Sequence, residues 1–130
     1  MTAAMTATMT RLVTTRAAAS ALGLVALGAL AQAPWKEVRA IGQRHFVVVD
    51  ASAARNPQVL RQAATAACLP VQPCVVTFWS DAAAVPRAMP MSLAQQQAVR
   101  AQYLRNPVTG KEELLLKCLP AGPVGVKCLR

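Results

Sequence analysis

Histidine and carboxylate side chains are scarce in this chain of 130 residues, which has one histidine and five aspartates and glutamates. Every mechanism with a histidine base, and every metal site built on several histidines, would depend on His45. A nucleophile–base–acid set can be imagined from Ser80, His45 and Asp81. However, Ser80 and Asp81 are adjacent in the sequence, and no G-x-S-x-G elbow surrounds the serine. We therefore expect His45 to be an ordinary boundary residue, and we expect neither catalytic residues nor a metal site.

Two of the few carboxylates occupy comparable positions. Asp50 and Asp81 each follow an apolar segment that is typical of a β-strand. If these strands are parallel neighbours, both carboxylates lie at the carboxyl edge of the sheet, where open α/β sheets bind ligands. Asp50 and Asp81 are therefore weak candidates for a binding site. The interpretation that we favour is that each accepts hydrogen bonds in the turn after its strand. The chain also has no glycine-rich phosphate loop, and we expect no cofactor.

Aromatic residues make up only 4% of the chain, whereas 14 lysines and arginines give it a formal net charge of +9. The basic residues are dispersed, with no run of three. Proteins that bind nucleic acid more often have a clustered basic stripe with aromatic side chains for stacking, so we do not expect a nucleic-acid partner. A basic surface can instead attract an anionic envelope polymer, a lipid or an acidic protein.

The N-terminus has the parts of a secretory signal peptide. Two arginines precede an uncharged apolar run over Ala17–Ala31, which ends in an A-x-A pattern. We predict cleavage after Ala31, so that residues 1–31 are the signal peptide of a periplasmic or secreted protein. Either Met1 or Met9 can be the start. The run is shorter than the roughly 20 residues of a membrane span, so we expect no span after cleavage. An uncleaved anchor is the alternative.

Four cysteines follow the predicted signal peptide, and an exported domain of this size commonly uses them in disulfides. Cys68 is expected to end a helix and Cys74 to begin a strand, with a proline-rich turn between them. We favour the pairs Cys68–Cys74 and Cys118–Cys128, while crossed pairings stay open. The C-x5-C spacing differs from the C-x-x-C of thiol–disulfide enzymes and from common zinc-binding pairs.

Capping and turn signals divide the rest of the chain into elements. Asn56 followed by Pro57 is typical of a helix start, and Ser92 with Gln95 three residues later predicts a capping box. Short β-branched or apolar runs indicate strands. These patterns predict helices over residues 57–68 and 92–105, and strands over residues 44–50, 74–81, 112–120 and 122–130.

The predicted order is β-α-β-α-β-β, in one α/β domain over residues 44–130 with residues 32–43 as a flexible lead-in. We expect one mixed sheet with two helices, in which crossover helices make the first strands parallel and the last two strands form an antiparallel hairpin. An α+β arrangement is the alternative fold class.

The segment from Cys74 to Cys118 has an FW-x-D strand end, VP and MP dipeptides, NP-x-TG and a final LLL-x-C strand. In these motifs it resembles a family of small uncharacterised exported bacterial proteins. The resemblance implies a recurrent exported domain and assigns a role to no residue.

Composition and motifs together favour a non-enzymatic binding protein or a protein associated with the cell envelope. Two alternatives belong to other classes. One is a small hydrolase-like enzyme that uses Asp50 and Asp81, and the other is a thiol–disulfide protein. A pocket that joins the two carboxylates would favour the enzyme, and an exposed, easily reduced Cys68–Cys74 bond would favour the thiol–disulfide protein.

Overall fold

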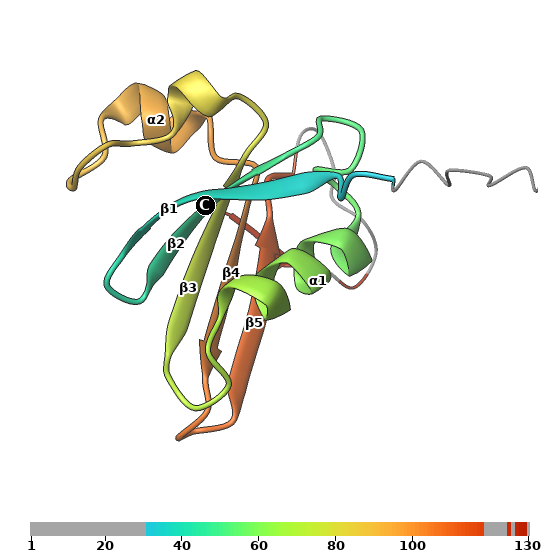
Figure 1. The fold of residues 1–130 in the computed structure, drawn as a ribbon, viewed down its shortest axis with the longest axis vertical. Helices are drawn as coiled ribbons and strands as arrows, with labels where there is room; N and C mark the ends of the chain where they lie inside the picture. The colour runs from blue at the N-terminus through green and yellow to red at the C-terminus, as the bar shows by residue number, and fades with distance from the viewer. Residues whose placement is uncertain (1–30, 119–124, 126, 130) are drawn as a thin grey trace, which may run out of the picture. The chain divides into compact units, whose positions relative to one another are not determined.

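The computed structural model describes residues 31–118, 125 and 127–129 of the chain. Within these residues, one mixed sheet has six strands in the sequential order β1-β2-β3-β4-β5-β6 (Figure 1). The strands are β1 (Trp35–Ile41), β2 (Arg44–Val49), β3 (Cys74–Trp79), β4 (Ala101–Asn106), β5 (Lys111–Leu116) and β6 (Lys127–Cys128), and the helical elements are α1 (Pro57–Ala67), the short 3-10 helix η1 (Ala82–Ala84) and α2 (Leu93–Gln97). The prediction of one mixed α/β sheet with two helices is confirmed.

The crossover through α1 makes β2 and β3 parallel, with His45 opposite Val76 and Val48 opposite Trp79. This places the carboxyl ends of β2 and β3 at one edge of the sheet. Short connections join β1 to β2 and β4 to β5, and both of these pairs are antiparallel, as is the pair β3–β4. The last pair, β5–β6, is parallel.

Helix α1 covers one face of the sheet (Figure 1). Its start is as predicted, because the Asn56 side chain accepts hydrogen bonds from the backbone N–H groups of Gln58 and Val59, and Pro57 occupies the first turn. The buried stripe of the helix packs against alternate residues of the strands, since successive side chains of a strand point to opposite faces. This core contains Val47, Val49, Leu60, Ala63, Ala64, Val76, Phe78, Ala101, Tyr103, Leu114 and Leu116.

The opposite face of the sheet has a second and smaller core, made by Phe46, Trp79 and Val99. The rings of Phe46 and Trp79 meet edge to face, with centroids 5.5 Å apart. The indole N–H of Trp79 donates to the carbonyl oxygen of Gln95 at 3.0 Å, which attaches α2 to the sheet. Partly buried residues on either side of α2, together with Leu129, complete this second core.

The predicted lead-in over residues 32–43 is wrong for most of its length. Residues Trp35–Ile41 form the edge strand β1, paired along β2 with an irregularity between Glu37 and Arg39. Only Trp35 of this strand packs against the α1 core. The strand has few buried apolar side chains, and its position depends on backbone pairing with β2 and on a bond of 2.8 Å between Glu37 and His45.

The second predicted helix, over residues 92–105, is wrong in its second half. The capping box of Ser92 and Gln95 is present, but α2 ends at Gln97 and the chain then enters β4. In β4, Ala101 and Tyr103 are buried on the α1 side, and the strand pairs with β3 on one side and β5 on the other. We expected the third predicted strand to pair in parallel with β3, but β4 lies between β3 and β5 and pairs with both in antiparallel orientation.

The predicted antiparallel hairpin at the C-terminus is also wrong. In β6, Lys127 and Cys128 lie parallel to β5, opposite Leu115 and Leu116. Most of the residues between Cys118 and Lys127 lie outside the described part of the chain.

Both predicted disulfides are present, Cys68–Cys74 and Cys118–Cys128. The first joins the end of α1 to the start of β3, with Cα atoms 5.8 Å apart. The second joins the residues that follow β5 to β6, with Cα atoms 5.4 Å apart. The described residues contain no free cysteine.

Candidate functional site

A basic recess of about 220 Å³ lies at the carboxyl edge of β2 and β3. Its lining residues come from segments far apart in the sequence and are Ala51, Ala54, Arg55, Ser80, Arg100 and Lys117. We call this group the basic recess. The topology explains why they meet, since β2 and β3 end here, β4 begins here and β5 ends here. Backbone hydrogen bonds hold the arrangement, from Arg100 N–H to the Phe78 carbonyl at 2.8 Å and from Lys117 N–H to the Arg100 carbonyl at 2.9 Å.

Ser80 contributes a polar atom that the fold leaves unsatisfied. Its Oγ is buried and has no hydrogen-bond partner among the residues that the structure describes. Buried hydroxyl groups are nearly always hydrogen-bonded, and each exception in a folded protein calls for an explanation. A hydroxyl can donate to an anion oxygen. The position of Ser80 in a recess lined by basic side chains therefore suits an anionic group.

The basic side chains of the recess differ in what they already contact. The Lys117 ammonium donates to the Gln97 carbonyl at the end of α2, which leaves it further donor capacity. Arg100 is exposed, and its guanidinium has no ion pair with any carboxylate in the described part of the chain. A guanidinium offers five N–H donors in a planar fork that matches carboxylate or phosphate oxygens.

The two candidate aspartates lie at the predicted edge but not in the recess. The register that pairs Val48 with Trp79 brings Asp50 and Asp81 to the same level, two residues further on. Neither lines the recess. Asp81 caps η1, accepting from the Ala83 N–H at 2.9 Å, so it has the turn role that the sequence favoured. The Asp50 carbonyl accepts from Ala53 N–H in the following turn. The recess at this edge therefore does not join the two carboxylates.

The imagined set of Ser80, His45 and Asp81 is not assembled. His45 lies opposite Val76 near the start of β3, whereas Ser80 follows the end of that strand. Four residues of extended chain separate these positions by roughly 13 Å. The His45 ring bonds Glu37 instead, at 2.8 Å. No group of three metal-ligating side chains occurs within the described ranges.

A groove of about 410 Å³ lies beside the recess, between α2 and the sheet. It mixes apolar side chains with glutamine amides and is lined by Thr77, Met91, Leu93, Gln96, Gln97, Val99, Gln102, Lys117 and Leu129. Lys117 lines both the groove and the recess, so the two are neighbours.

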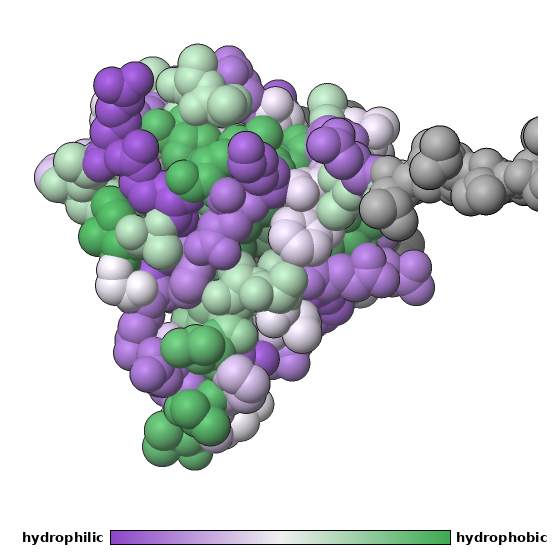
Figure 2. Space-filling model, viewed as in Figure 1, coloured by the Kyte–Doolittle hydropathy of each residue, from purple (hydrophilic) through white to green (hydrophobic). Residues whose placement is uncertain are grey.

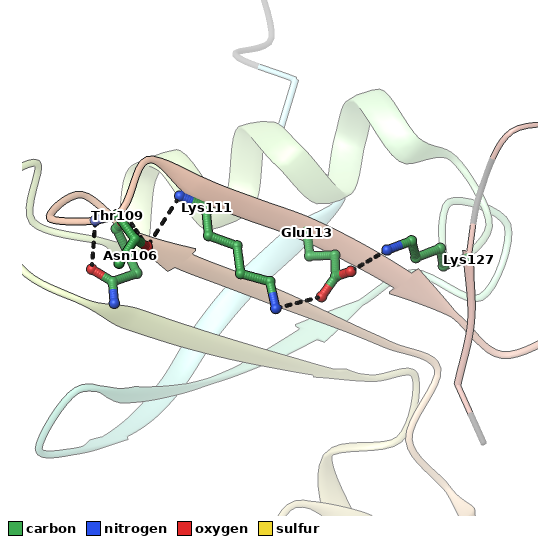
Figure 3. Close-up of polar contacts among 5 residues, drawn as sticks. All are labelled: Asn106, Thr109, Lys111, Glu113 and Lys127. Carbon is green, nitrogen blue, oxygen red and sulfur yellow. Dashed lines mark hydrogen bonds and ion pairs between the residues drawn. The ribbon is translucent and has the colours of Figure 1, made fainter.

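Two glutamates of β5 form ion pairs within the fold. Glu113 lies between Lys111 at 3.7 Å and Lys127 at 2.5 Å, which ties β6 to β5 (Figure 3). The hydrogen bond from Lys127, followed by the charge of Lys111, holds the pKa of Glu113 below its ordinary value. Glu112 pairs with Arg61 at 2.7 Å. Glu112 and Glu113 are thus engaged in ion pairs with basic residues outside the recess.

Tyr103 is the buried hydroxyl of the α1 core. Burial raises its pKa above the ordinary value, and the nearby Glu112 carboxylate raises it further. Tyr103 lies in the middle of β4, away from the recess at the start of that strand. Its role is structural.

The disulfide Cys68–Cys74 is shielded from solvent, since its cysteines are only 6% and 3% exposed. Thiol–disulfide exchange requires access of an attacking thiolate to the sulfur. The exposed bond that a thiol–disulfide protein would need is therefore not found at this position.

Comparisons with models of protein families, with curated proteins and with solved structures each find no match for this chain. The resemblance to small exported bacterial proteins therefore stays a prediction. Among the described residues, no helix combines the length and apolar character that a bilayer span requires.

Among the residues of the recess, sequence reasoning singled out only Ser80, and only as one member of the imagined catalytic set. Arg55, Arg100 and Lys117 were counted only as members of a dispersed basic set. Arg100 lies in a segment that was predicted to be helical, so its place at the start of β4 could not be foreseen. The positions of Ser80 and Lys117 directly after a strand could have indicated that both lie at an edge of the sheet. Placing them at the same edge would have required the pairing of the strands, which the sequence did not reveal.

Proposed function

We propose that this chain is an exported, non-enzymatic protein of the cell envelope that binds an anionic polymer through the basic recess. One observation supports the proposal above the others. Three basic residues line a single recess at the carboxyl edge of the parallel strands together with Ser80, whose buried Oγ has no hydrogen-bond partner among the described residues. This is the edge at which open α/β sheets commonly bind ligands.

The adjoining groove favours a polymer over a small free anion. A ligand whose acidic group enters the recess can extend past Lys117 along the groove, where it meets glutamine amides and apolar side chains. Amide side chains both donate and accept hydrogen bonds, and they suit hydroxyl-rich or peptide-like repeats. Phosphate and carboxylate repeats share the anionic chemistry that the recess would bind.

The signal-like N-terminus over residues 1–31 supports export. Two disulfides in a small domain fit an oxidising compartment such as the periplasm or the extracellular space. Outside the inner membrane, a protein of net positive charge meets anionic polymers at high local concentration.

Calorimetric titration of the exported protein with tripolyphosphate, with trigalacturonate and with neutral maltotriose tests the proposal. We expect binding of one or both anionic probes, and the comparison identifies the preferred acidic group. Arg100→Gln should weaken that binding by about tenfold or more, because a charge-assisted hydrogen bond is lost. Ser80→Ala should weaken it by a smaller factor.

Arg87→Gln is the matched control, because it removes one exposed positive charge outside the recess. It should leave the affinity nearly unchanged. Equal losses in Arg100→Gln and Arg87→Gln would show that only net charge matters, and that result would refute the site. Failure of both anionic probes to bind the wild-type protein would refute the function.

A further inference from the structure

The end of the sheet opposite the basic recess has exposed apolar side chains at its loop tips. In the turn between α1 and β3, Leu69 is 59% exposed and Val71 is 81% exposed, and in the β4–β5 turn Val108 is 86% exposed. We call these three residues the apolar tip. Figure 1 places both turns at the lower end of the view, and Figure 2 shows hydrophobic residues at that end. Isolated exposed apolar residues are ordinary, but a cluster of them indicates an interaction site.

The two turns are neighbours because β3 starts where β4 ends. Cys74 lies opposite Arg105 in the antiparallel pair. The Arg105 guanidinium also donates to the Leu69 carbonyl at 2.8 Å, which links one turn directly to the other. The apolar tip is therefore one feature of the folded chain, although its residues are far apart in the sequence.

Both turns are held in shape without help from the apolar side chains. The Cys68–Cys74 disulfide closes the first turn. In the second turn, the Asn106 side chain accepts from the backbone N–H of Val108 at 3.0 Å. It also accepts from the backbone N–H of Thr109 at 3.4 Å (Figure 3). Exposure of Leu69, Val71 and Val108 is thus not needed to form the fold, and insertion of these side chains would require little reordering of the backbone.

Basic side chains surround the apolar tip. Arg44 begins β2, Arg105 lies near the end of β4, and Lys111 begins β5, all at this end of the sheet. Asp50 and Asp81, for which the described residues show no ion pair, follow β2 and β3 at the opposite end. Arg44, Arg105 and Lys111 outnumber the two carboxylates at this end, Glu112 and Glu113, so the apolar tip is combined with a net positive charge.

We infer that the apolar tip inserts into the surface of an anionic lipid bilayer, with Arg44, Arg105 and Lys111 at the level of the headgroups. Peripheral binding of this kind combines buried apolar area with attraction to anionic lipids. The apolar side chains project from two turns, and none of them lines the recess or the groove described above. A bilayer can accept such separate tips, whereas a protein partner would need a matching surface for each.

Vesicle flotation of the exported protein, with phosphatidylcholine alone and with added phosphatidylglycerol, tests the inference. N-terminal sequencing first establishes where the purified chain begins. We expect binding to the anionic vesicles that falls as salt is raised. The double variant Val71→Ser/Val108→Ser should lower the partition coefficient by about tenfold or more, through lost apolar burial. Arg44→Gln should lower it about fivefold, through one lost charge near the surface.

Two substitutions serve as matched controls. Leu93→Ser removes an apolar side chain that is 70% exposed on α2, outside the tip. Lys36→Gln removes a charge from the other end of the β1–β2 pair, opposite Val48. Both should leave vesicle binding nearly unchanged. Arg100→Gln should also leave it unchanged, which separates this inference from the proposed function.

A reporter variant gives a second readout. The emission of Val71→Trp should shift to the blue with anionic vesicles and should be quenched by brominated lipid, while Leu93→Trp should show neither effect. Full binding by Val71→Ser/Val108→Ser, or equal loss in Leu93→Ser, would overturn the inference. A third result would also overturn the inference: the wild-type protein is a dimer in solution and does not bind vesicles, and the double variant is a monomer. The apolar tip would then bind a second copy of the chain.

Discussion

Removal of each disulfide in turn should separate the entropic from the packing contribution of the two bonds. The perturbations are the double variants Cys68→Ala/Cys74→Ala and Cys118→Ala/Cys128→Ala. The first bond closes a loop with a chain separation of 6, and the second closes one with a separation of 10. A disulfide stabilises a protein in the chain-entropy model because it restricts the unfolded chain, and more strongly for longer loops. On entropy alone, the second bond should matter more.

The magnitudes reverse this order once burial is included. Loop closure contributes about 2.2 kcal/mol for the separation of 6 and about 2.7 kcal/mol for the separation of 10. Cys68 and Cys74 belong to the α1 core, and each buried sulfur that is lost adds a cost comparable to a methylene group, about 0.8 kcal/mol. Cys128 is exposed, so its loss adds little packing cost. We expect free-energy losses of about 4 kcal/mol for the first variant and about 2.7 kcal/mol for the second.

Guanidinium unfolding followed by far-UV circular dichroism measures both free energies. Intact pairing in the wild-type protein is first checked by peptide mapping without reductant. A larger loss for Cys118→Ala/Cys128→Ala than for Cys68→Ala/Cys74→Ala would refute the reasoning that burial outweighs loop length. No loss in either variant would show that neither bond restricts the unfolded chain.

Three further predictions concern single groups. Asn56→Ala should lower the free energy of unfolding by about 1 kcal/mol through loss of the α1 cap, and an unchanged denaturation midpoint would contradict this. The hydrogen bond from Lys127 lowers the pKa of Glu113, so the ionised Glu113 should stabilise the fold above the ordinary pKa of 4.5, and this stabilisation should be lost as pH falls through the lowered pKa. In thermal melts across that pH range, Glu113→Gln should lose less stability than the wild-type protein. Tyr103 is the only tyrosine, and absorbance at 295 nm should titrate above pH 10.0, because burial and then Glu112 raise its pKa. The free energy of unfolding should accordingly fall as pH rises through that raised pKa. A midpoint of the absorbance titration at or below pH 10.0 would contradict this prediction.

Helix α1 and strands β2 and β3 were predictable because their signals are local. Asn56 and Pro57 specify a helix start through bonds within a few residues of the chain. The β-branched run before Asp50 specifies a strand buried on both faces. The Cys68–Cys74 pair follows from the same short-range geometry, since a turn of this length brings the two residues close together.

Strand β4 could not be predicted from its residues. Its composition favours a helix, and the capping box at Ser92 starts one correctly. The helix ends early because Ala101 and Tyr103 gain burial, and their backbones gain hydrogen bonds, between β3 and β5. Tertiary context overrides a weak local preference of this kind. The edge strand β1 escaped prediction for the same reason, since pairing with β2 specifies it more than its own pattern does.

The candidate site divides along the same line. Asp50 and Asp81 lie at the same edge of the sheet because β2 and β3 are parallel, and the sequence predicted this shared position. The chemistry at that edge was not, because it depends on Arg100 and Lys117, which β4 and β5 deliver. An edge that looked acidic in sequence therefore has a recess lined by basic side chains.

By itself, the sequence determined the start of α1, two buried strands and a positive net charge, and it favoured the cysteine pairs while leaving crossed pairings open, because each of these depends on neighbouring residues or on composition. Only the tertiary structure decided the course of β1, β4 and β6, and with it which side chains meet. The Ser80 hydroxyl and the basic side chains come from separate segments, as do Leu69 and Val108 at the other end of the sheet. Their proximity results from strand pairing over long chain separations, which no local pattern encodes.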